Sequence, residues 1–421
     1  MKVNAPKGTK DILPEEVYKW HYIEDVIQEI CNNFNYNQIR LPVFEHTELF
    51  QRGVGDTTDI VQKEMYTFED KGGRSITLRP EGTAGVVRSY IEHGMASKPS
   101  PVKLYYNITA YRYENVQKGR YREFNQFGVE AFGSNDPQMD IEVIMLMKTI
   151  LEKLDLTDVV LKINSIGCPQ CRAKYNQMLK EYLAPCIKSM CENCQTRFEK
   201  NPLRILDCKE DRCKEQIEGA PLLADYLCED CNNHFEQVKH GLDACQIDYQ
   251  VDKMIVRGLD YYVKTVFEFV SENVGTQGTI CGGGRYDGLV KVCGGSDEPG
   301  IGFAMGLERL LMELDSRNFS FKEPEKLKLY ISSVGDESKF FASRLTYQLR
   351  KQGLKCQNDI SGRSLKAQMK HADKMQAQYV LVIGDDEREE GAGTLKNMAT
   401  GETKTIFFDQ LYKQLCNTEE A

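Results

Sequence analysis

One short stretch of the sequence combines residue types that can hold a small polar ring beside a phosphate. Its polar and aromatic residues are Arg257, Asp260, Tyr261 and Tyr262, followed after a polar loop by Arg285 and Tyr286. Three glycines, Gly282 to Gly284, precede Arg285 and allow a sharp turn or a close approach of the backbone to a ligand. A guanidinium, a carboxylate and phenols together supply donors, acceptors and positive charge. The alternative interpretation is a hairpin with ordinary aromatic packing and solvated arginines.

A second group of candidate ligands lies on a predicted hairpin over residues 102–133. KLYYNITAYRYE forms the first predicted strand, the turn is centred on Gly119, and EFNQFGVEAFG returns. The candidates on it are Arg112, Glu114, Lys118, Arg120, Arg122, Phe124, Gln126 and Glu130. Arginines can hold phosphates, and an aromatic ring beside a guanidinium can stack on a base, so the pattern is typical of a nucleotide site. A solvated basic hairpin is the alternative.

Composition and charge exclude several classes of protein. The chain has 421 residues, enough for about two or three domains with their own cores. No apolar run is long enough to span a bilayer, and the N-terminus carries proline and charge where a secretion signal needs an apolar stretch. We therefore expect a cytoplasmic protein with no membrane association. The net charge of −9 argues against a nonspecific coat on nucleic acid, although a local basic surface remains compatible with it.

The cysteines are crowded into one region, since nine of the 15 fall between Cys168 and Cys231. In a cytoplasmic chain such crowding indicates metal ligands more than disulfides. The candidate ligands are the pairs Cys168–Cys171, Cys191–Cys194 and Cys228–Cys231, with the wider pair Cys208–Cys213. Two pairs can close one four-cysteine zinc site. One expected site joins the first two pairs, and the other joins Cys208 and Cys213 with Cys228 and Cys231. Buried, reduced thiols on helices are the alternative.

Hydrophobic periodicity predicts the elements that position the candidate ligands. Residues 15–34 carry one apolar stripe, which predicts a helix facing the core. Pro42 interrupts the next apolar run and places that strand at an edge or an interface. Glu81 lies at a break between a strand and a helix that begins at about Thr83, where it can project into a site or interact with the helix dipole. Residues 263–269 alternate with period two and predict a largely buried strand.

Towards the C-terminus the pattern changes twice. Glycines at 300, 302 and 306 precede an apolar helix that carries Arg309, and without an alternating βαβ pattern they indicate close packing of strand against helix, not a dinucleotide site. From about Lys326 strands and helices alternate in a small α/β unit, after the linker SRNFSFKEPEK. The expected domains are therefore residues 1–325, interrupted by a mostly helical cysteine-rich insertion at 168–241, and residues 326–421.

Taken together, these stretches resemble the class II aminoacyl-tRNA synthetases, and among them the histidyl-tRNA synthetases. The matching motifs, in chain order, are KGTKDILP, TLRPEGTAGVVR, RYENVQKGRYREFNQFGVE, VRGLDYYVKTVFEF, GGGRYDGL and GIGFAMGLERL. The resemblance implies an α+β fold: an antiparallel active-site sheet flanked by helices, with the insertion and a C-terminal α/β domain that binds the anticodon. It also implies a homodimer, with the segment around Pro42 near the interface.

The resemblance further implies a reaction and a set of site residues. Histidine and ATP, supplied as its Mg²⁺ complex, would form histidyl-adenylate and pyrophosphate, and the histidyl group would then pass to the 3′ end of the histidine tRNA. The implied catalytic residues are Arg112, Arg257 and Arg309. Those implied for ATP are Arg112, Glu114, Arg120, Phe124 and Arg309. Those implied for histidine are Glu81, Thr83, Gln126, Glu130, Arg257, Tyr261, Tyr262 and Tyr286. Zinc in the insertion, distant in sequence from these residues, is expected to support the insertion and its grip on tRNA and not adenylation.

The sequence departs from the common pattern of the family at two places in the hairpin. Asn115 and Val116 stand where many bacterial members carry Arg-Pro, and Asn125 stands where histidine is common. A non-catalytic, synthetase-like regulatory subunit of ATP phosphoribosyltransferase is the main alternative, but that paralogue lacks the anticodon domain and catalytic arginines. A zinc-organised nucleic-acid adaptor without catalysis would leave RGLDYY and GGRYDGL unexplained.

Overall fold

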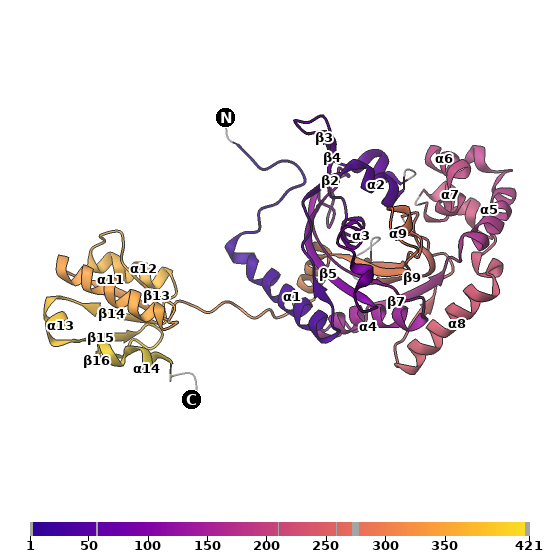
Figure 1. Cartoon of the computed structure of the whole chain (residues 1–421). Helices are drawn as coiled ribbons and strands as arrows, with labels where there is room; N and C mark the ends of the chain where they lie inside the picture. Colours follow the sequence, from indigo (N-terminus) through magenta and orange to yellow (C-terminus); the bar gives the residue numbers. More distant parts are fainter. Residues whose placement is uncertain (1–2, 56–57, 209, 258, 272–277, 417–421) are drawn as a thin grey trace. The chain divides into compact units, whose positions relative to one another are not determined.

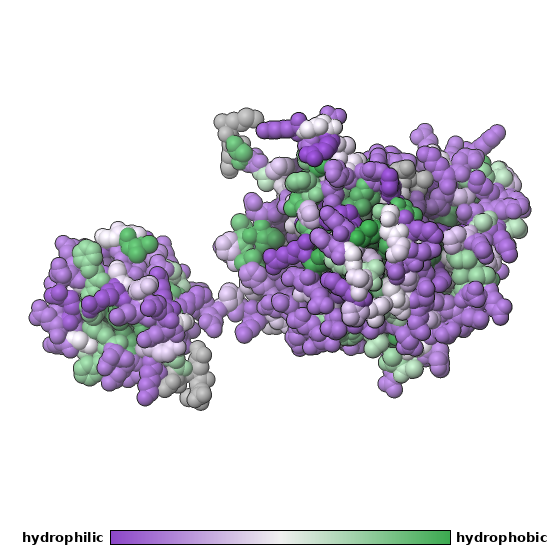
Figure 2. All heavy atoms as spheres, in the orientation of Figure 1, coloured by the Kyte–Doolittle hydropathy of each residue, from purple (hydrophilic) through white to green (hydrophobic). Residues whose placement is uncertain are grey.

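The computed structural model of this chain describes residues 3–55, 58–208, 210–257, 259–271 and 278–416. Gly258 of the VRGLDYY stretch, and residues 272–277 of the polar loop that follows it, lie outside the described residues. The chain divides into two compact units, Met1–Phe321 and Lys322–Ala421. Each unit has its own apolar core, and the visible surface of both is mainly hydrophilic with small hydrophobic patches (Figure 2).

The first unit contains a large sheet, a small sheet and the insertion. Its strands are β1 (Asn37–Gln38), β2 (Phe44–His46), β3 (Thr67–Glu69), β4 (Ser75–Leu78), β5 (Val102–Tyr111), β6 (Glu123–Phe132), β7 (Val160–Ser165), β8 (Gln250–Val251), β9 (Val263–Val270), β10 (Thr279–Arg285) and β11 (Gly300–Gly306). Its α-helices are α1 (Pro14–Asn33), α2 (Thr47–Val54), α3 (Thr83–Glu92), α4 (Pro137–Lys153), α5 (Pro169–Leu183), α6 (Glu192–Lys200), α7 (Asp211–Ile217), α8 (Glu229–Ala244), α9 (Leu289–Val292) and α10 (Leu307–Ser316). Short helical turns include η1 (Ile60–Glu64) and η4 (Pro202–Asp207).

The large sheet has the strand order β1-β5-β6-β11-β10-β9-β7-β8. Its six central strands pair antiparallel, while the short edge strands β1 and β8 pair parallel with β5 and β7. This arrangement confirms the expected α+β fold with an antiparallel sheet. The predicted hairpin is β5 and β6, in which Tyr111 lies opposite Glu123.

Helices cover both faces of the large sheet (Figure 1). Helices α1, α4, α8 and α10 bury apolar side chains against one face, where Ile27, Val143 and Phe267 are almost fully buried. Helices α3 and α9 cover part of the other face, where Tyr106 of β5 and Val266 of β9 are buried. Since both faces are partly covered, strand β9 is buried along most of its length, which confirms the largely buried strand predicted for residues 263–269.

The segment around Pro42 differs from the single strand expected of it. Pro42 lies between β1, which extends the large sheet, and β2, an edge strand of a three-stranded sheet ordered β2-β4-β3. Proline has no N–H to donate to a central ladder, so the chain changes sheets at this residue. Val43 and Phe44 remain exposed at this edge, at 43% and 57% of their surface.

The second unit is a small α/β domain. Its elements are β12 (Leu329–Ser333), α11 (Asp336–Lys351), β13 (Cys356–Asn358), α12 (Leu365–Lys374), β14 (Tyr379–Ile383), α13 (Asp385–Glu390), β15 (Ala392–Asn397), β16 (Thr403–Phe407) and α14 (Leu411–Cys416). The sheet order is β13-β12-β14-β15-β16, with the first three strands parallel and the last two antiparallel. None of the helices described in either unit is long and apolar enough to cross a bilayer.

Candidate active site

A cavity of about 990 Å³ opens on the face of the large sheet that carries α3. Strands β6, β9, β10 and β11 form its floor, and the hairpin, the stretch after Val256 and helix α10 form its walls. Of the residues implied for the site, those that line it are Glu81, Thr83, Arg112, Glu114, Arg120, Phe124, Gln126, Arg257, Tyr261, Tyr262 and Arg309. The volume is in the range that a nucleotide or drug-sized ligand requires.

Glu130 and Tyr286 lie beneath this cavity in a buried polar cluster. Each is about 1% exposed, and the Tyr286 hydroxyl donates a hydrogen bond to Glu130. The Thr83 hydroxyl donates to Glu130 Oε1 at 2.7 Å, and the Tyr106 hydroxyl lies 3.3 Å from the same oxygen. Burial raises the pKa of Glu130 to about 8, against the opposing effect of these hydroxyl donors. Thr83 also lines the cavity, so its hydroxyl connects the buried cluster to the cavity wall.

Glu81 occupies the break at the start of α3, as predicted. Its two carboxylate oxygens accept hydrogen bonds from the backbone N–H groups of Thr83, at 2.7 Å, and Ala84, at 2.8 Å. Burial raises the pKa of Glu81, while the same N–H donors favour its ionised form. Beside it, the Gln126 side chain accepts a hydrogen bond from the Gly82 N–H at 2.9 Å. These contacts hold both side chains in one orientation, so this wall of the cavity is polar and pre-organised.

Glycines on the sheet make room for this cluster. A Cβ on Gly302 would lie 2.1 Å from Glu130 Oε2, and a Cβ on Gly300 would lie 2.3 Å from the Tyr286 ring. On β10, a Cβ on Gly282 would lie 2.4 Å from the Arg257 guanidinium. The prediction that Gly300 and Gly302 allow a strand to pack against a helix is therefore wrong, because the space they leave is filled by Tyr286 and Glu130. A Cβ on Gly306 would meet no heavy atom of the described residues within 4 Å.

Three arginines converge on one end of the cavity. Arg112 comes from the end of β5 and places its guanidinium 5.3 Å from the centroid of the Phe124 ring. Arg120 pairs with Glu114 at 3.0 Å. Arg309 on α10 donates to the carbonyls of Thr279 and Gly119 at 3.0 and 3.3 Å. Burial, with repulsion from Arg120 and Arg112, lowers the pKa of Arg309. Crowded cations of this kind suit an anionic ligand with several phosphates.

Arg257 lies apart from those three arginines, on the floor of the cavity. Its guanidinium forms an ion pair with Glu268 of β9 and lies 5.7 Å from the centroid of the Tyr262 ring. Glu268 also accepts a hydrogen bond from the Thr279 hydroxyl at 3.0 Å. The sequence motifs did not indicate Glu268 as a site residue, although a carboxylate inside the apolar run VKTVFEF was a signal for it. The rings of Tyr261 and Tyr262 stand 4.6 Å apart beside this pair.

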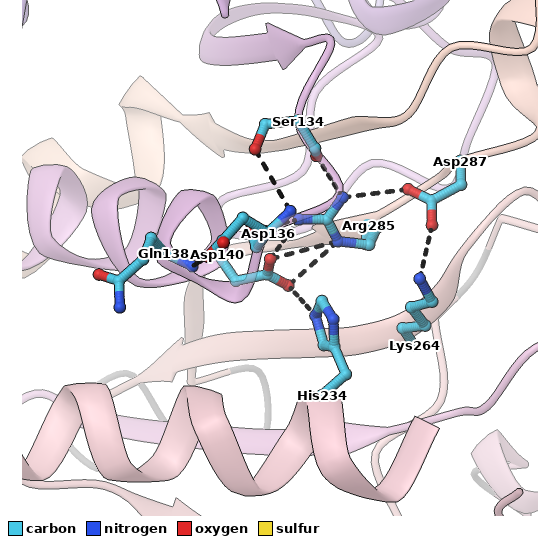
Figure 3. A network of polar contacts seen from close by, with 8 residues as sticks. All are labelled: Ser134, Asp136, Gln138, Asp140, His234, Lys264, Arg285 and Asp287. Atoms are coloured by element: carbon cyan, nitrogen blue, oxygen red, sulfur yellow. Dashed lines mark hydrogen bonds and ion pairs between the residues drawn. The ribbon is translucent and has the colours of Figure 1, made fainter. Parts of the chain in front are cut away.

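Arg285 has a different place from the one that its position beside the glycines suggested. It is fully buried and binds Asp140 of α4 in an ion pair (Figure 3). It also donates to the Ser134 carbonyl at 2.8 Å, and His234 of α8 contacts Asp140 at 3.2 Å. Burial opposes ionisation of Asp140, but the Arg285 guanidinium and His234 hold the pKa of this carboxyl below its usual value. Arg285 thus joins β10, α4 and α8, and it is not among the residues that line the cavity.

The eight paired cysteines of the insertion form two groups that could each hold a metal ion. One group contains Cys168, Cys171, Cys228 and Cys231, and the other contains Cys191, Cys194, Cys208 and Cys213. The arrangement expected from the sequence is therefore wrong in its partners: the first pair joins the last one, and the two inner pairs join each other. The reason is topological, since the insertion leaves the sheet after β7 and returns to β8 and β9, which both pair with β7. Its two ends must meet.

Known proteins match this chain along almost its whole length. The family model for histidyl-tRNA synthetase matches residues 8–310, and that for an anticodon binding domain matches residues 328–418. A histidine–tRNA ligase of Acetivibrio thermocellus is 64% identical over 415 residues, covering 99% of this chain and 100% of the relative, and one of Caldanaerobacter subterraneus subsp. tengcongensis is 53% identical at the same coverage.

A solved structure agrees with both sequence comparisons. The apo histidyl-tRNA synthetase of S. aureus is 43% identical and superposes with a TM-score of 0.84, covering 98% of this chain and 100% of that chain. The match includes the C-terminal domain whose absence would mark the regulatory paralogue, so that alternative is not favoured. By sequence, by fold and by the domain that follows its catalytic unit, this chain belongs to the histidyl-tRNA synthetase family.

Proposed function

We propose that the cavity binds histidine and ATP side by side, with each predicted residue in the role that its position allows. The chain is a histidine–tRNA ligase, which forms histidyl-adenylate with release of pyrophosphate and then charges the histidine tRNA with release of AMP. The observation that carries the assignment of roles is the division of the cavity into two ends. One end holds three crowded arginines, and the other holds buried carboxylates and phenols.

At the arginine end, Arg120 and Arg309 would bind the outer phosphates of ATP and Arg112 the α-phosphate. ATP arrives with Mg²⁺ as part of the substrate. Phe124 would stack on the adenine and Glu114 would contact its edge, since both line this end of the cavity. An in-line displacement at phosphorus gains more from positioning and positive charge than from covalent catalysis. Guanidinium groups already held by carbonyls and carboxylates supply that charge without reorganisation.

At the other end, Glu81, Thr83 and Gln126 would contact the substrate histidine, with Tyr261 and Tyr262 along its side. A carboxylate suits the α-ammonium group, and hydroxyl or amide oxygens suit the imidazole. Glu130 and Tyr286 would act one layer further in, by orienting Thr83. Arg257 lies between the two ends, so its charge would act where the histidine carboxylate attacks the α-phosphate.

Histidine-dependent exchange of pyrophosphate into ATP tests this assignment. The full chain is expected to catalyse exchange with histidine and with no other standard amino acid, because the site is lined by polar groups fitted to one side chain. Exchange that proceeds equally with another amino acid would refute the assignment of the histidine end. A chain that binds histidine but exchanges no pyrophosphate would refute the roles of the arginines.

The first unit also offers an edge at which a second copy of the chain could bind. The segment around Pro42 leaves Val43 and Phe44 exposed, and an apolar edge of this kind fits a subunit contact. The chain would therefore act as a homodimer through this edge. In each copy, residues 1–325 would form the catalytic domain and residues 326–421 the domain that reads the anticodon. A Phe44→Ser variant is expected to sediment as a monomer at concentrations where the unaltered chain sediments as a dimer. Sedimentation of the unaltered chain as a monomer would refute the dimer.

Zinc is the metal that the insertion would hold. Thiolates are soft ligands, and four of them around one tetrahedral ion are typical of structural zinc. The eight cysteines involved are Cys168, Cys171, Cys191, Cys194, Cys208, Cys213, Cys228 and Cys231.

A further inference from the structure

The two cysteine groups have the spacing of a single tetrahedral ion each. Zinc–sulfur bonds of about 2.3 Å place two thiolates of a tetrahedron about 3.8 Å apart. The Sγ atoms of Cys191 and Cys208 are 3.8 Å apart, and those of Cys168 and Cys171 are 3.5 Å apart. In each group all four Sγ atoms lie within 4.8 Å of one another. The separations are much longer than the disulfide bond of about 2.05 Å.

The backbone supports thiolates at both groups. Cys168, Cys191 and Cys228 are the N-caps of helices α5, α6 and α8, and the second cysteine of each pair lies three residues further on, in the first turn. A helix N-terminus favours negative charge and lowers the cost of ionising a thiol. The Cys228 N–H donates to Cys171 Sγ at 3.1 Å, and the Cys191 N–H donates to Cys213 Sγ at 3.3 Å. Each of these bonds links two different pairs of the same group.

The cysteines of the second group form a large part of the packing of the inner insertion. Helix α6 has nine residues and helix α7 has seven, which is too short for a helix to be stable by itself. The apolar cluster that α6 and α7 share with α5 and η4 includes all four cysteines of the second group among its buried members. Small folds of this size usually depend on a metal or a disulfide in addition to their core.

The segment between the ligands of the second group reaches the active-site cavity. Between Cys194 and Cys208 lies η4, and its residues Arg204 and Asp207 line the same cavity as Arg112 and Arg257. Just before η4, the Asn201 side chain donates to Asp260 Oδ1 at 2.8 Å. Asp260 belongs to the VRGLDYY stretch. The second group is therefore close to the active-site cavity, although its cysteines are far from Arg112 and Arg257 in the sequence. A metal in this group would lie one short helix away from the substrates.

We propose that the insertion binds two zinc ions in nested sites, an outer one at Cys168, Cys171, Cys228 and Cys231 and an inner one at Cys191, Cys194, Cys208 and Cys213. The outer ion closes the neck of the insertion, where the chain leaves the sheet and returns to it. The inner ion holds α6, η4 and α7, and through Asn201 and η4 it fixes one wall of the active site. This second role rests on the proposed function of the cavity, whereas the two sites themselves do not.

Metal analysis tests the two sites without reference to activity. The full chain, purified without added metal or chelator, is expected to contain two zinc per chain. The double variants C168S/C171S and C191S/C194S are each expected to contain one. C186S is the matched control, since Cys186 is a half-buried cysteine of the insertion outside both groups, and it is expected to contain two. Less than about 1.5 zinc per chain in the unaltered protein, or iron in its place, would overturn the proposal.

A second measurement uses only the unaltered chain, so it tests the two sites even if a double variant fails to fold. In the unaltered chain, the eight grouped thiols are expected to resist a thiol reagent until a mercurial displaces the metal, and two equivalents of zinc should then reach a colorimetric chelator. Release of a single equivalent, or free reaction of all eight thiols at the start, would overturn the two-site arrangement.

Kinetics of pyrophosphate exchange test the role of the inner ion. Asn201→Ala removes the contact with Asp260 and leaves every cysteine in place, so it is expected to retain two zinc. Its kcat/KM is expected to fall roughly tenfold, because small displacements of positioning groups are costly. C191S/C194S should lose at least as much, and C186S should match the unaltered chain. Unaltered kcat/KM in both Asn201→Ala and C191S/C194S would refute the coupling. Absence of exchange in the unaltered chain would instead refute the proposed function.

Discussion

Replacement of Arg257 by alanine is the most direct test of how the cavity supports adenylation. The guanidinium is already held by Glu268 and lies over the Tyr262 ring, and its side chain is 19% exposed. A donor fixed in this way needs little reorganisation when charge develops at the α-phosphorus. Loss of one pre-organised donor costs about 3–4 kcal/mol in the transition state, which is a decrease in rate on the order of 10²–10³-fold. Binding of histidine should weaken far less.

The variant also leaves Glu268 without its cation, and the cost of that change must be separated from the loss of catalysis. Removal of one partner from a fully buried ion pair costs about 3–5 kcal/mol of stability. Here both side chains are about one-fifth exposed, at 19% and 20%, and the Thr279 hydroxyl still donates to Glu268, so we expect a loss nearer to about 1–2 kcal/mol. The R257A/E268Q double variant removes the lone charge. It should recover stability in urea unfolding but not the rate of adenylation.

Single-turnover formation of histidyl-adenylate is the assay, measured together with the Kd for histidine. Arg257→Lys retains one positive charge but not the planar fork, so it should also be slow. A normal single-turnover rate in the alanine variant would refute the role of Arg257. A rate that recovers fully in R257A/E268Q would show that the lone carboxylate, and not the missing guanidinium, had caused the defect.

Three further predictions concern the sheet, the buried acid and the second unit. Gly302→Ala should destabilise the chain by about 1–3 kcal/mol in urea unfolding, because its Cβ would meet Glu130, whereas Gly306→Ala should change stability by less than about 0.5 kcal/mol. Burial raises the pKa of Glu130 from 4.5 to about 8, so between these pH values the native state retains a proton that the unfolded state loses. The free energy of unfolding should therefore fall as pH rises through this range. Glu130→Gln should flatten this part of the stability profile, and equal profiles for the variant and the unaltered chain would contradict the raised pKa of Glu130. A chain ending at Phe321 should retain pyrophosphate exchange but lose most tRNA charging, and unchanged charging would contradict an anticodon role for the second unit.

The position chosen for that truncation illustrates what the sequence could and could not predict. The linker was recognised from its composition, but Phe319 and Phe321 within it pack against Tyr22 of α1, with ring centroids 5.7 and 5.8 Å apart. A cut before them would remove part of the catalytic core. Local composition predicts where regular elements stop, because polar and glycine- or proline-rich segments do not sustain them. It does not predict which linker side chains find a tertiary partner.

The same limit applies to the candidate site. Periodicity and motif resemblance predicted the hairpin, the Glu81 break and the arginine of α10, since each depends on residues close together in the chain. The pairing of the cysteines, the Glu268 partner of Arg257 and the contribution of Arg204 depend on chain segments far apart. Spacing within a Cys-x-x-Cys pair is local information, but which pairs lie together is decided by the return of the insertion to the sheet.

The buried network around Asp140 shows why the insertion and the catalytic sheet should be regarded as one structure. Arg285 of β10 and His234 of α8 both contact Asp140 (Figure 3), and α8 has Cys228 of the outer cysteine group at its N-cap and carries Cys231 of the same group. An ion pair with both side chains fully buried stabilises little overall, but loss of one partner leaves an uncompensated charge. Such a network therefore favours one arrangement of α8 on the sheet over others. At the start of α8 the Cys228 N–H donates to Cys171 Sγ of α5, and further along the helix His234 contacts Asp140 of α4. Helix α8 therefore connects the insertion to the helices that pack on the catalytic sheet.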